Sequence, residues 1–444
     1  MRVEVRVRRV ISPTALVMIL VFLLTAAGAC YVRKLVLEKG MVSAMEARDL
    51  DMMKSLAECW PAPVNVLKRE EARIQTSGLP LKYDWTTPLH IAAEKGDAEL
   101  ARVLVRRGAK IDAKRGGNQP IHAVAEAAHQ ASWWMNRWRA SASLVPQNPP
   151  EKFALTAEVL LDAGAEVDAR TEMEYKTPLH FAAAAGDLRF VKLLLARGAK
   201  VNALDIYRQT PLDYTLLPGA DDKVPILLLR SGADPLIENC DNETALDWAA
   251  GDGNPNVLRV MVECGLDPNK TLRNGFTLLD LALNHRDYEL FHEVLPGREC
   301  RDLLRVLIEK GANVNAPDPD GNIPLCQAVT AEMVRMLVAA GADVNARETD
   351  GWTPLHAMIS RYEPIWEGWD PSGESRRAML ENWVGAIEAL LAAGADVNAE
   401  TSDGETPMSI LIDRLCKAGK AEDAEDADGF RRIREILLKA GAKE

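Results

Sequence analysis

The same four-residue phrase, Thr-Pro-Leu-His, occurs three times in this chain of 444 residues. The three copies begin at Thr87, Thr177 and Thr353. Altered copies of the phrase begin at Gln119, Thr210, Thr244, Thr277, Ile323 and Thr406. Successive copies are separated by 32, 58, 33, 34, 33, 46, 30 and 53 residues. A period close to 33 residues, lengthened at a few places, indicates a protein built from stacked repeats.

Each repeat carries the signals of two helices. Thr87 is a good N-cap, and the next residue, Pro88, suits the first helical turn. Gly96-Asp97 is expected to end this helix, and a more apolar helix is expected to follow it. A glycine, the usual left-handed C-terminal cap, then closes every repeat. The nine closing glycines are Gly108, Gly164, Gly198, Gly232, Gly265, Gly311, Gly341, Gly394 and Gly441.

A polar connector follows each closing glycine and leads into a turn. Four connectors contain an Asx-Gly dipeptide, at Asn274-Gly275, Asp320-Gly321, Asp350-Gly351 and Asp403-Gly404. Such dipeptides favour tight reversing turns, because both central positions can require a positive φ. The unit of helix, loop, helix and hairpin resembles the ankyrin repeat, from about Met41 to the C-terminus. The resemblance implies an all-α ankyrin-repeat solenoid of about nine full repeats, after a degenerate capping half-repeat near residues 45–56.

The resemblance also implies which residues support the stack and which face a ligand. The histidine that ends the phrase, as in His90, His122, His180 and His356, is expected to join adjacent hairpins by hydrogen bonds. A protein partner is expected on the concave face, against the residues just before the phrase. Carried onto this chain, these candidate protein-binding residues are Trp85, Thr86, Tyr175, Lys176, Arg208, Gln209, Phe276 and Trp352. The alternative is that Trp85 and Trp352 only brace neighbouring hairpins.

Insertions are expected where the distance from phrase to closing glycine exceeds the usual 21 residues. They lie near residues 129–153, 285–300, 360–383 and 412–429, and should project from one edge of the stack. Two of them hold six of the ten tryptophans, namely Trp133, Trp134, Trp138, Trp366, Trp369 and Trp383. These side chains either form small satellite cores or form an exposed patch for a partner or a membrane surface. The acidic insertion at 412–429 is expected to be a solvated loop.

The N-terminus predicts a membrane element. A basic segment, residues 1–9, precedes an apolar stretch at 10–32, which is long enough to cross a bilayer. We expect a single-pass anchor, followed by a juxtamembrane segment and the capping half-repeat at 33–82 and by the solenoid at 83–444. A signal peptide cleaved after the small residues 27–29, a lipoprotein at Cys30 and a buried helix are the alternatives. The positive-inside rule slightly favours repeats on the extracytoplasmic (periplasmic) side.

Composition limits the remaining functions. The chain is 48% apolar and only 5% aromatic, which suits an alanine- and leucine-rich helical stack. Its net charge of −12 disfavours nucleic acid as a ligand, because that binding requires neutralised phosphates. The seven cysteines show no disulfide framework or zinc spacing, and scattered thiols favour a reducing compartment, against the orientation argument.

Catalysis has one weak candidate. His285, Glu289 and His292 would share a face of a continuous helix, with Glu293 beside them, and could hold a metal. The repeat alignment instead separates His285 from the others, because it predicts a second helix at 288–295 and an additional helix at 302–310. No phosphate loop or nucleophile motif occurs. We expect a non-enzymatic protein-binding scaffold without cofactor or small-molecule substrate. The alternatives are an envelope component that contacts lipid or wall through its tryptophans and, more distantly, a metal-dependent enzyme.

Overall fold

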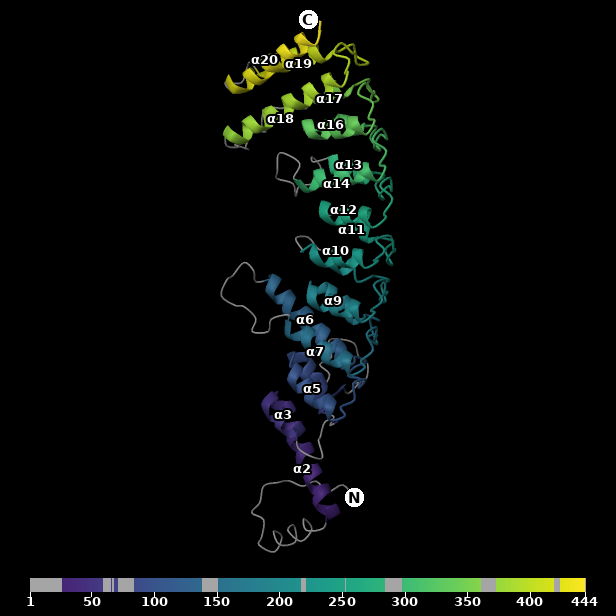
Figure 1. The fold of residues 1–444 in the computed structure, drawn as a ribbon, viewed down its shortest axis with the longest axis vertical. Coiled ribbons are helices and arrows are strands. Elements are labelled where there is room, and N and C mark those ends of the chain that lie inside the picture. Colours follow the sequence, from purple (N-terminus) through teal and green to yellow (C-terminus); the bar gives the residue numbers. More distant parts are fainter. Residues whose placement is uncertain are drawn as a thin grey trace, which may run out of the picture. The chain divides into compact units, whose positions relative to one another are not determined.

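The computed structural model describes residues 26–58, 65, 68–70, 84–137, 151–216, 221–251, 253–283, 298–360, 373–418 and 424–443. The chain divides into two compact units. Unit 1 comprises Met1–Thr215, Gly219–Ala233 and Glu238–Asp241, and unit 2 comprises Leu216–Pro218, Asp234–Ile237 and Asn242–Glu444. Within each unit, helix pairs lie one after another and the connectors run along one edge (Figure 1). The domain boundaries expected from sequence stay predictions.

Unit 1 holds the cap and repeats one to four, numbered by the copies of the phrase. Its helices are α2 (Ala26–Ala47), α3 (Leu50–Glu58), α4 (Pro88–Lys95), α5 (Ala98–Arg106), α6 (Pro120–Arg137), α7 (Glu151–Asp162), α8 (Pro178–Ala184), α9 (Leu188–Ala196), the 3-10 helix η1 (Asp213–Thr215) and α10 (Lys223–Arg230). Two short antiparallel strands, β1 (Lys68–Glu70) and β2 (Asp84–Thr86), precede the first repeat.

Unit 2 holds repeats five to nine. Its helices are α11 (Ala245–Gly251), α12 (Pro255–Glu263), α13 (Leu278–Leu283), α14 (Arg298–Glu309), α15 (Pro324–Gln327), α16 (Ala331–Ala339), α17 (Pro354–Ser360), α18 (Gly373–Ala392), α19 (Pro407–Ala418) and α20 (Ala424–Lys439). First helices pack on first helices and second helices on second helices, as α15 does on α17 and α12 does on α14. Because each pair covers its neighbour, apolar residues such as Leu304 and Leu355 are fully buried.

The expected helix signals act as predicted in repeat one. The Thr87 side chain accepts a hydrogen bond from the His90 amide, and Pro88 occupies the first turn of α4. Gly96 ends α4 in the left-handed conformation, with a φ of 67°. The Asp97 carboxylate then caps α5 by accepting from the amides of the second and third helical residues. The ends of both helices are therefore set by local capping chemistry.

The closing glycines confirm the repeat boundaries. All nine have a positive φ, between 84° at Gly108 and 111° at Gly265. Turn glycines show the same conformation two residues before the phrase, with a φ of 87° at Gly275 and 77° at Gly351. The amide of Gly275 donates to the Leu272 carbonyl, and the Leu272 amide donates to the carbonyl of Phe276. The connectors therefore form the short hairpins that the Asx-Gly turns predicted.

The phrase histidine joins successive hairpins, as the resemblance implied. In repeat three, Nδ1 of His180 lies 2.9 Å from the Thr177 hydroxyl, and Nε2 lies 3.2 Å from the Gln209 carbonyl of the next hairpin. Nε2 of His90, His122 and His356 reaches the carbonyls of Asn118, Ala169 and Glu405 in the same way. We call this contact the His link.

A second recurring contact comes from an asparagine four residues after the closing glycine. Nδ2 of Asn315 donates to the Gly341 carbonyl at 3.0 Å, and its Oδ1 accepts from the Asp343 amide at 2.8 Å. We call this pair of bonds the Asn ladder. The carbonyl bond recurs from Asn65, Asn202, Asn269, Asn345 and Asn398 to the next closing glycine. One amide side chain thus satisfies two backbone groups of the neighbouring repeat.

The predicted single-pass membrane protein is wrong. Over the residues that the structure describes, no helix is both long and apolar enough to cross a membrane. The helix α2 begins inside the expected span at 10–32 and continues through the charged residues Arg33 and Lys34 that directly follow this span. Charged residues within a helix oppose its burial in hydrocarbon. Residues 1–25, which carry the rest of the expected apolar helix, lie outside the described residues, as does the basic segment.

Repeat six differs from expectation. α14, which covers all but the last of the residues 302–310 predicted to form an additional helix, packs against both α12 and α16 and therefore is the second helix of repeat six. In repeat seven the phrase and the closing glycine are only 18 residues apart, and its first helix, α15, has only four residues. Parts of the four predicted insertions lie outside the described residues, as do Trp138, Trp366 and Trp369 and the tetrad at 285, 289, 292 and 293.

Replacing a closing glycine should cost stability through the backbone alone. A Cβ at Gly198 would meet no atom within 4 Å, but φ there is 84°. Gly198→Ala should therefore lower the free energy of unfolding by about 1 kcal/mol. Gly251→Ala is the matched control, since its Cβ also meets nothing within 4 Å and its φ is not left-handed. Urea unfolding of both variants checks this, and equal stabilities would contradict Gly198 as a left-handed cap.

The His links should make unit 1 sensitive to mild acid. Burial lowers the pKa of His90 and His180 to about 4. The unfolded chain binds protons on these rings below about pH 6.5, so stability is full above that value and is lost as pH falls towards 4. Each ring should cost about 2 kcal/mol of stability at pH 5. Burial raises the pKa of Asp187 and Asp213, which acts in the opposite direction.

Urea unfolding of the chain and of His180→Gln at pH 7.5 and pH 5 measures this effect. The variant should lose less stability than the parent chain over this interval. An equal loss in both proteins would show that His180 does not titrate on unfolding.

Candidate functional site

The hairpins before repeats three and four form a joined pair in unit 1. The first is closed by the Thr171 amide, which donates to the Lys176 carbonyl at 3.0 Å. The second is closed by the Asp205 amide, which donates to the Gln209 carbonyl at 3.1 Å. The Ile206 amide joins the two, donating to the Glu174 carbonyl at 2.9 Å. Backbone bonds therefore fix the tips of these hairpins relative to each other.

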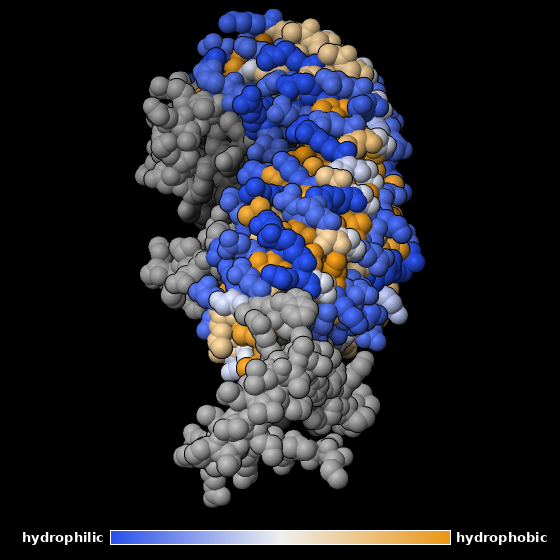
Figure 2. Space-filling model, turned by 60° about the horizontal axis from the view of Figure 1, so that its bottom comes forward, coloured by the Kyte–Doolittle hydropathy of each residue, from blue (hydrophilic) through white to orange (hydrophobic). Residues whose placement is uncertain are grey.

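Large apolar side chains are exposed on these two tips. The exposed fractions are 80% for Met173, 49% for Tyr175, 48% for Ile206 and 55% for Tyr207. We call these four residues the tip patch. Scattered single apolar residues are normal on a protein surface, whereas several on adjacent turns mark a candidate binding surface. The face drawn in Figure 2 shows the usual pattern, with apolar residues scattered among hydrophilic ones.

Two residues of these tips hold a left-handed backbone without being glycine. Tyr175 has a φ of 55° and Arg208 a φ of 60°, two residues before the phrase. Gly321 and Gly351 hold the same position in repeats seven and eight. A bulky side chain at positive φ costs about 1 kcal/mol or more. Both residues are therefore held in this conformation by the surrounding structure rather than by their own backbone preference.

Polar contacts beneath the tips support the second hairpin. The Asp205 carboxylate accepts hydrogen bonds from the Tyr207 and Gln209 amides, both at 2.8 Å, and from the Tyr214 hydroxyl at 2.7 Å. Burial and this bond to a carboxylate raise the pKa of Tyr214. Lys176 pairs with Glu174 at 2.9 Å, and its ammonium lies 4.9 Å from the centre of the Tyr214 ring. The Lys176 ammonium group is therefore partly engaged by contacts with Glu174 and Tyr214 within unit 1.

The remaining predicted binding residues differ in accessibility. Thr86 is fully buried, and Trp85 lies in β2 opposite Arg69 of β1. Phe276 is half-buried in the hairpin before repeat six. Trp352 is also half-buried and packs against the buried cluster of Ile323, Cys326 and Ala357. This contact fits the bracing alternative, and the part of these residues in binding stays a prediction.

Arg208 combines an exposed side chain with a tie to the next connector. Its Nε donates to the Glu238 carbonyl at 3.3 Å. The structure thus brings Tyr175, Lys176, Arg208 and Gln209 together on neighbouring hairpins. Sequence analysis missed Met173, Ile206 and Tyr207. Their signal was available, since apolar residues at turn positions have no packing reason to be there.

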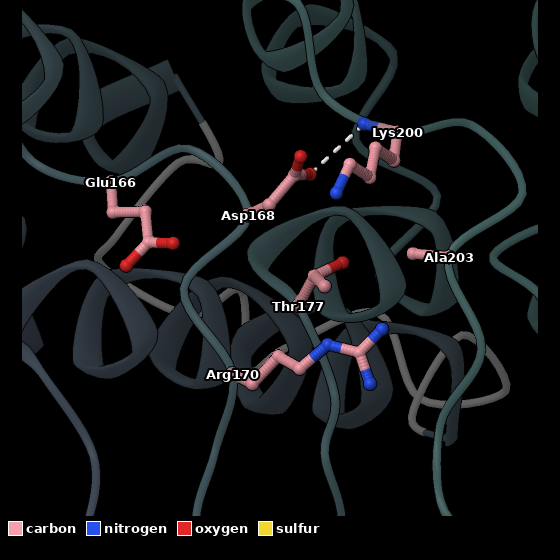
Figure 3. Close-up of a pocket in the computed structure, with 6 residues that line it drawn as sticks. All are labelled: Glu166, Asp168, Arg170, Thr177, Lys200 and Ala203. Carbon is pink, nitrogen blue, oxygen red and sulfur yellow. Dashed lines mark hydrogen bonds between the residues drawn. The ribbon is translucent and has the colours of Figure 1, made fainter.

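A cavity of about 290 Å³ lies among the connectors of unit 1 (Figure 3). It is lined by Glu166, Asp168, Arg170, Thr177, Lys200 and Ala203. Asp168 holds the ladder position here and accepts from the Lys200 amide at 2.9 Å, but a carboxylate has no amide group to donate to Gly198. Exposed charges of both signs line the cavity, unlike the mostly apolar lining of small-molecule sites.

Metal-ligating side chains are not brought together in the part of the chain that the structure describes. Within it, no three histidine, cysteine or acidic side chains lie close enough to hold a metal ion. Cys326 is buried in the His position of repeat seven, where it serves as a small apolar residue.

Two family models match this chain. The model of the ankyrin repeat matches residues 84–115, and the model of ankyrin repeats in many copies matches residues 160–214 and 302–356. Each matched segment contains at least one copy of the phrase and at least one closing glycine.

Similar curated proteins contain the same repeats. Over 259 residues the chain is 31% identical to ankyrin repeat and SOCS box protein 16 of Homo sapiens, covering 56% of this chain and 49% of that protein. It is 28% identical over 195 residues to B-cell lymphoma 3 protein of Homo sapiens, covering 42% and 38%. Identity to Inversin of Homo sapiens is 31% over 181 residues, covering 39% and 17%. The matches thus span half or less of each relative.

Among solved structures, the ankyrin repeat domain of Bcl-3 shows 26% identity and covers 58% of this chain and 98% of that chain. Its TM-score is 0.36, so the assignment rests on the sequence models and the repeat geometry instead. Because the matched segments are in register with the helix pairs and hairpins described above, this chain is an ankyrin-repeat protein.

Proposed function

We propose that the chain is a non-enzymatic scaffold that binds a protein partner, and that the tip patch is the centre of its binding surface in unit 1. The observation that supports this most is the gathering of Met173, Tyr175, Ile206 and Tyr207 on two joined tips. Folding gains little from apolar side chains that stay in water. Binding of a partner that covers these side chains would gain the free energy of burying their apolar surface.

The chemistry of the patch suits protein recognition. Tyrosine offers a large apolar ring with few rotatable bonds, and it is enriched among residues that dominate interface energy. Methionine adapts its shape to different apolar surfaces. The hydroxyls of Tyr175 and Tyr207 add directional hydrogen bonds that can select among partners.

The rigidity of the tips supports the same proposal. Binding loses affinity when flexible loops must be ordered. Here the hydrogen bond from Ile206 to Glu174 and the three bonds to the Asp205 carboxylate fix the tips in advance. Most of the apolar area covered by a partner would then contribute to affinity.

Arg208 and the other predicted residues have secondary parts in this proposal. Arg208 would supply a charged contact at the edge of the tip patch. In unit 2, Phe276 and Trp352 would offer smaller contact areas, because both are half-buried already. Trp85, Lys176 and Gln209 complete the proposed surface of unit 1. The comparisons name only the repeat family, so the identity of the partner is left to experiment.

Removing the tip patch should abolish capture of the partner without unfolding the chain. The variant combines Met173→Ser, Tyr175→Asn, Ile206→Ser and Tyr207→Ser. Asparagine suits position 175 because Asn242 holds the same left-handed position, with a φ of 55°. Capture from native lysate, measured by quantitative mass spectrometry, should fall by roughly 30-fold or more, the equivalent of one strong hot spot.

Met52→Ser and Leu155→Ser together form the matched control. Both residues are exposed apolar side chains of unit 1, but they lie on α3 and α7 rather than on hairpin tips. This variant should capture the same proteins as the parent chain, and both variants should keep the parent's helical circular dichroism. Unchanged capture by the tip variant, with loss on replacing Trp133, Trp134 and Trp383, would move the binding surface to the insertions.

A further inference from the structure

The His link and the Asn ladder are distributed unevenly along the stack. The histidine position is filled by Asp213, Asp247 and Asp280 in repeats four to six, and by Cys326 in repeat seven. Each aspartate accepts hydrogen bonds from the threonine of its own phrase. A carboxylate has no proton to donate to the carbonyl of the following hairpin. The His link is therefore lost across repeats four to seven.

The Asn ladder compensates at most of these places. Asn202 keeps the ladder at repeat four, Asn269 at repeat six and Asn315 at repeat seven. At repeat five the ladder position holds Leu236, a side chain without donor or acceptor and 40% exposed. Of the described junctions between successive hairpins, the one after repeat five alone lacks both links, because Leu236 and Asp247 coincide there.

The acceptor for the missing His link is present at this junction. The Phe276 carbonyl accepts from the Leu272 amide at 2.8 Å. In the same way the Gln209 carbonyl accepts from the Asp205 amide, and it also receives His180. A carbonyl oxygen has two lone pairs, so the second position on Phe276 is available to a histidine at 247.

The second helices of this junction, α12 and α14, pack closely, with one gap in the contact. A small apolar cavity of about 20 Å³ lies between repeats five and six, lined by residues such as Leu258, Leu281, Cys300 and Leu303. Atoms that line a cavity lose dispersion contacts on that side. The two repeats are joined by the packing of α12 on α14. They are also joined by an exposed hydrogen bond, which Arg273 donates to the Asn242 carbonyl at 2.5 Å. Exposed polar contacts of this kind add little stability.

We propose that the junction between repeats five and six is a built-in hinge of unit 2, at which the two hairpins separate more readily than at any other described junction of that unit while α12 stays packed on α14. Repeats six to nine then open and close as one block. Opening at a junction costs the stacking contacts and side-chain links of that junction only. The junction after repeat five has neither a His link nor an Asn ladder to lose. This inference does not depend on what the scaffold binds.

Hydrogen–deuterium exchange of the full chain tests the proposal. The amides of Leu272 and Gly275, bonded within the hairpin before repeat six, should exchange faster than those of Asp318 and Gly321 in the next hairpin. The double variant Leu236→Asn, Asp247→His restores both missing links. It should slow exchange at 272 and 275 by roughly two- to tenfold for each link restored.

Two further variants make the result specific. Asp168→Asn restores a ladder bond elsewhere, in unit 1, and should leave exchange at 272 and 275 unchanged. Asn315→Leu removes the ladder where Cys326 already replaces the histidine. It should create a second hinge and speed exchange in residues 341–353 by roughly two- to tenfold.

The proposal is overturned if residues 272 and 275 exchange as slowly as 318 and 321 in the parent chain. It is also overturned if the double variant folds but exchanges at the parent rate. Should the double variant fail to fold, Leu236→Asn alone decides, because position 236 is partly exposed and the change removes little packing. That single variant must slow exchange at 272 and 275.

Discussion

Each repeat can bury its apolar helices only against the next repeat, and the rest of the structure depends on this constraint. A pair such as α4 and α5 exposes apolar surface on both sides, and Leu89, Leu100 and Leu104 become fully buried because the neighbouring pairs cover them. Within each unit, the described residues are buried between neighbouring helix pairs rather than around one central core. Stability is instead a sum of neighbour contacts, so a weak junction affects its own surroundings and not the whole stack. This is why the composition of each single junction has physical consequences.

The repeat boundaries could be predicted because they rest on local chemistry. A closing glycine is required where φ is positive, and a threonine followed by proline starts a helix almost anywhere.

The candidate site was less predictable. Tyr175 and Arg208 occupy a left-handed turn position that holds glycine in repeats six to nine, so no turn signal marked these two tips. The membrane prediction failed for a related reason. The number of consecutive apolar residues predicted a membrane span, but the helix α2 continues through the charged residues Arg33 and Lys34. Repeat six was misread because its phrase and its second helix are separated by an insertion.

The contacts that stabilise the fold are separate from the side chains that the hairpin tips expose. Hairpin shape is set by backbone bonds and by the Asp205 carboxylate, none of which needs a particular side chain at the tips. The tips can therefore carry exposed apolar residues such as Met173 and Tyr207 without loss of shape. The strained backbone at Tyr175 fits the same division. Helix stacking supplies the stability that holds the residue there, and the strained residue contributes a ring that the fold itself does not use.

Folding and presentation are not fully separate at the carbonyl groups that accept the His links. His122 reaches the Ala169 carbonyl and His180 reaches the Gln209 carbonyl. These carbonyls belong to the connectors that carry the tip patch. Protonation would put a charge on a buried ring that is held as a neutral acceptor for its threonine, and burial already lowers the pKa of both histidines. In unit 2 the Asn ladder joins successive hairpins from Asn269 to Asn398 without a titrating group, and His356 is the one phrase histidine there, with a pKa that burial also lowers. Mild acid is therefore expected to weaken the links to the hairpins that carry the proposed binding surface.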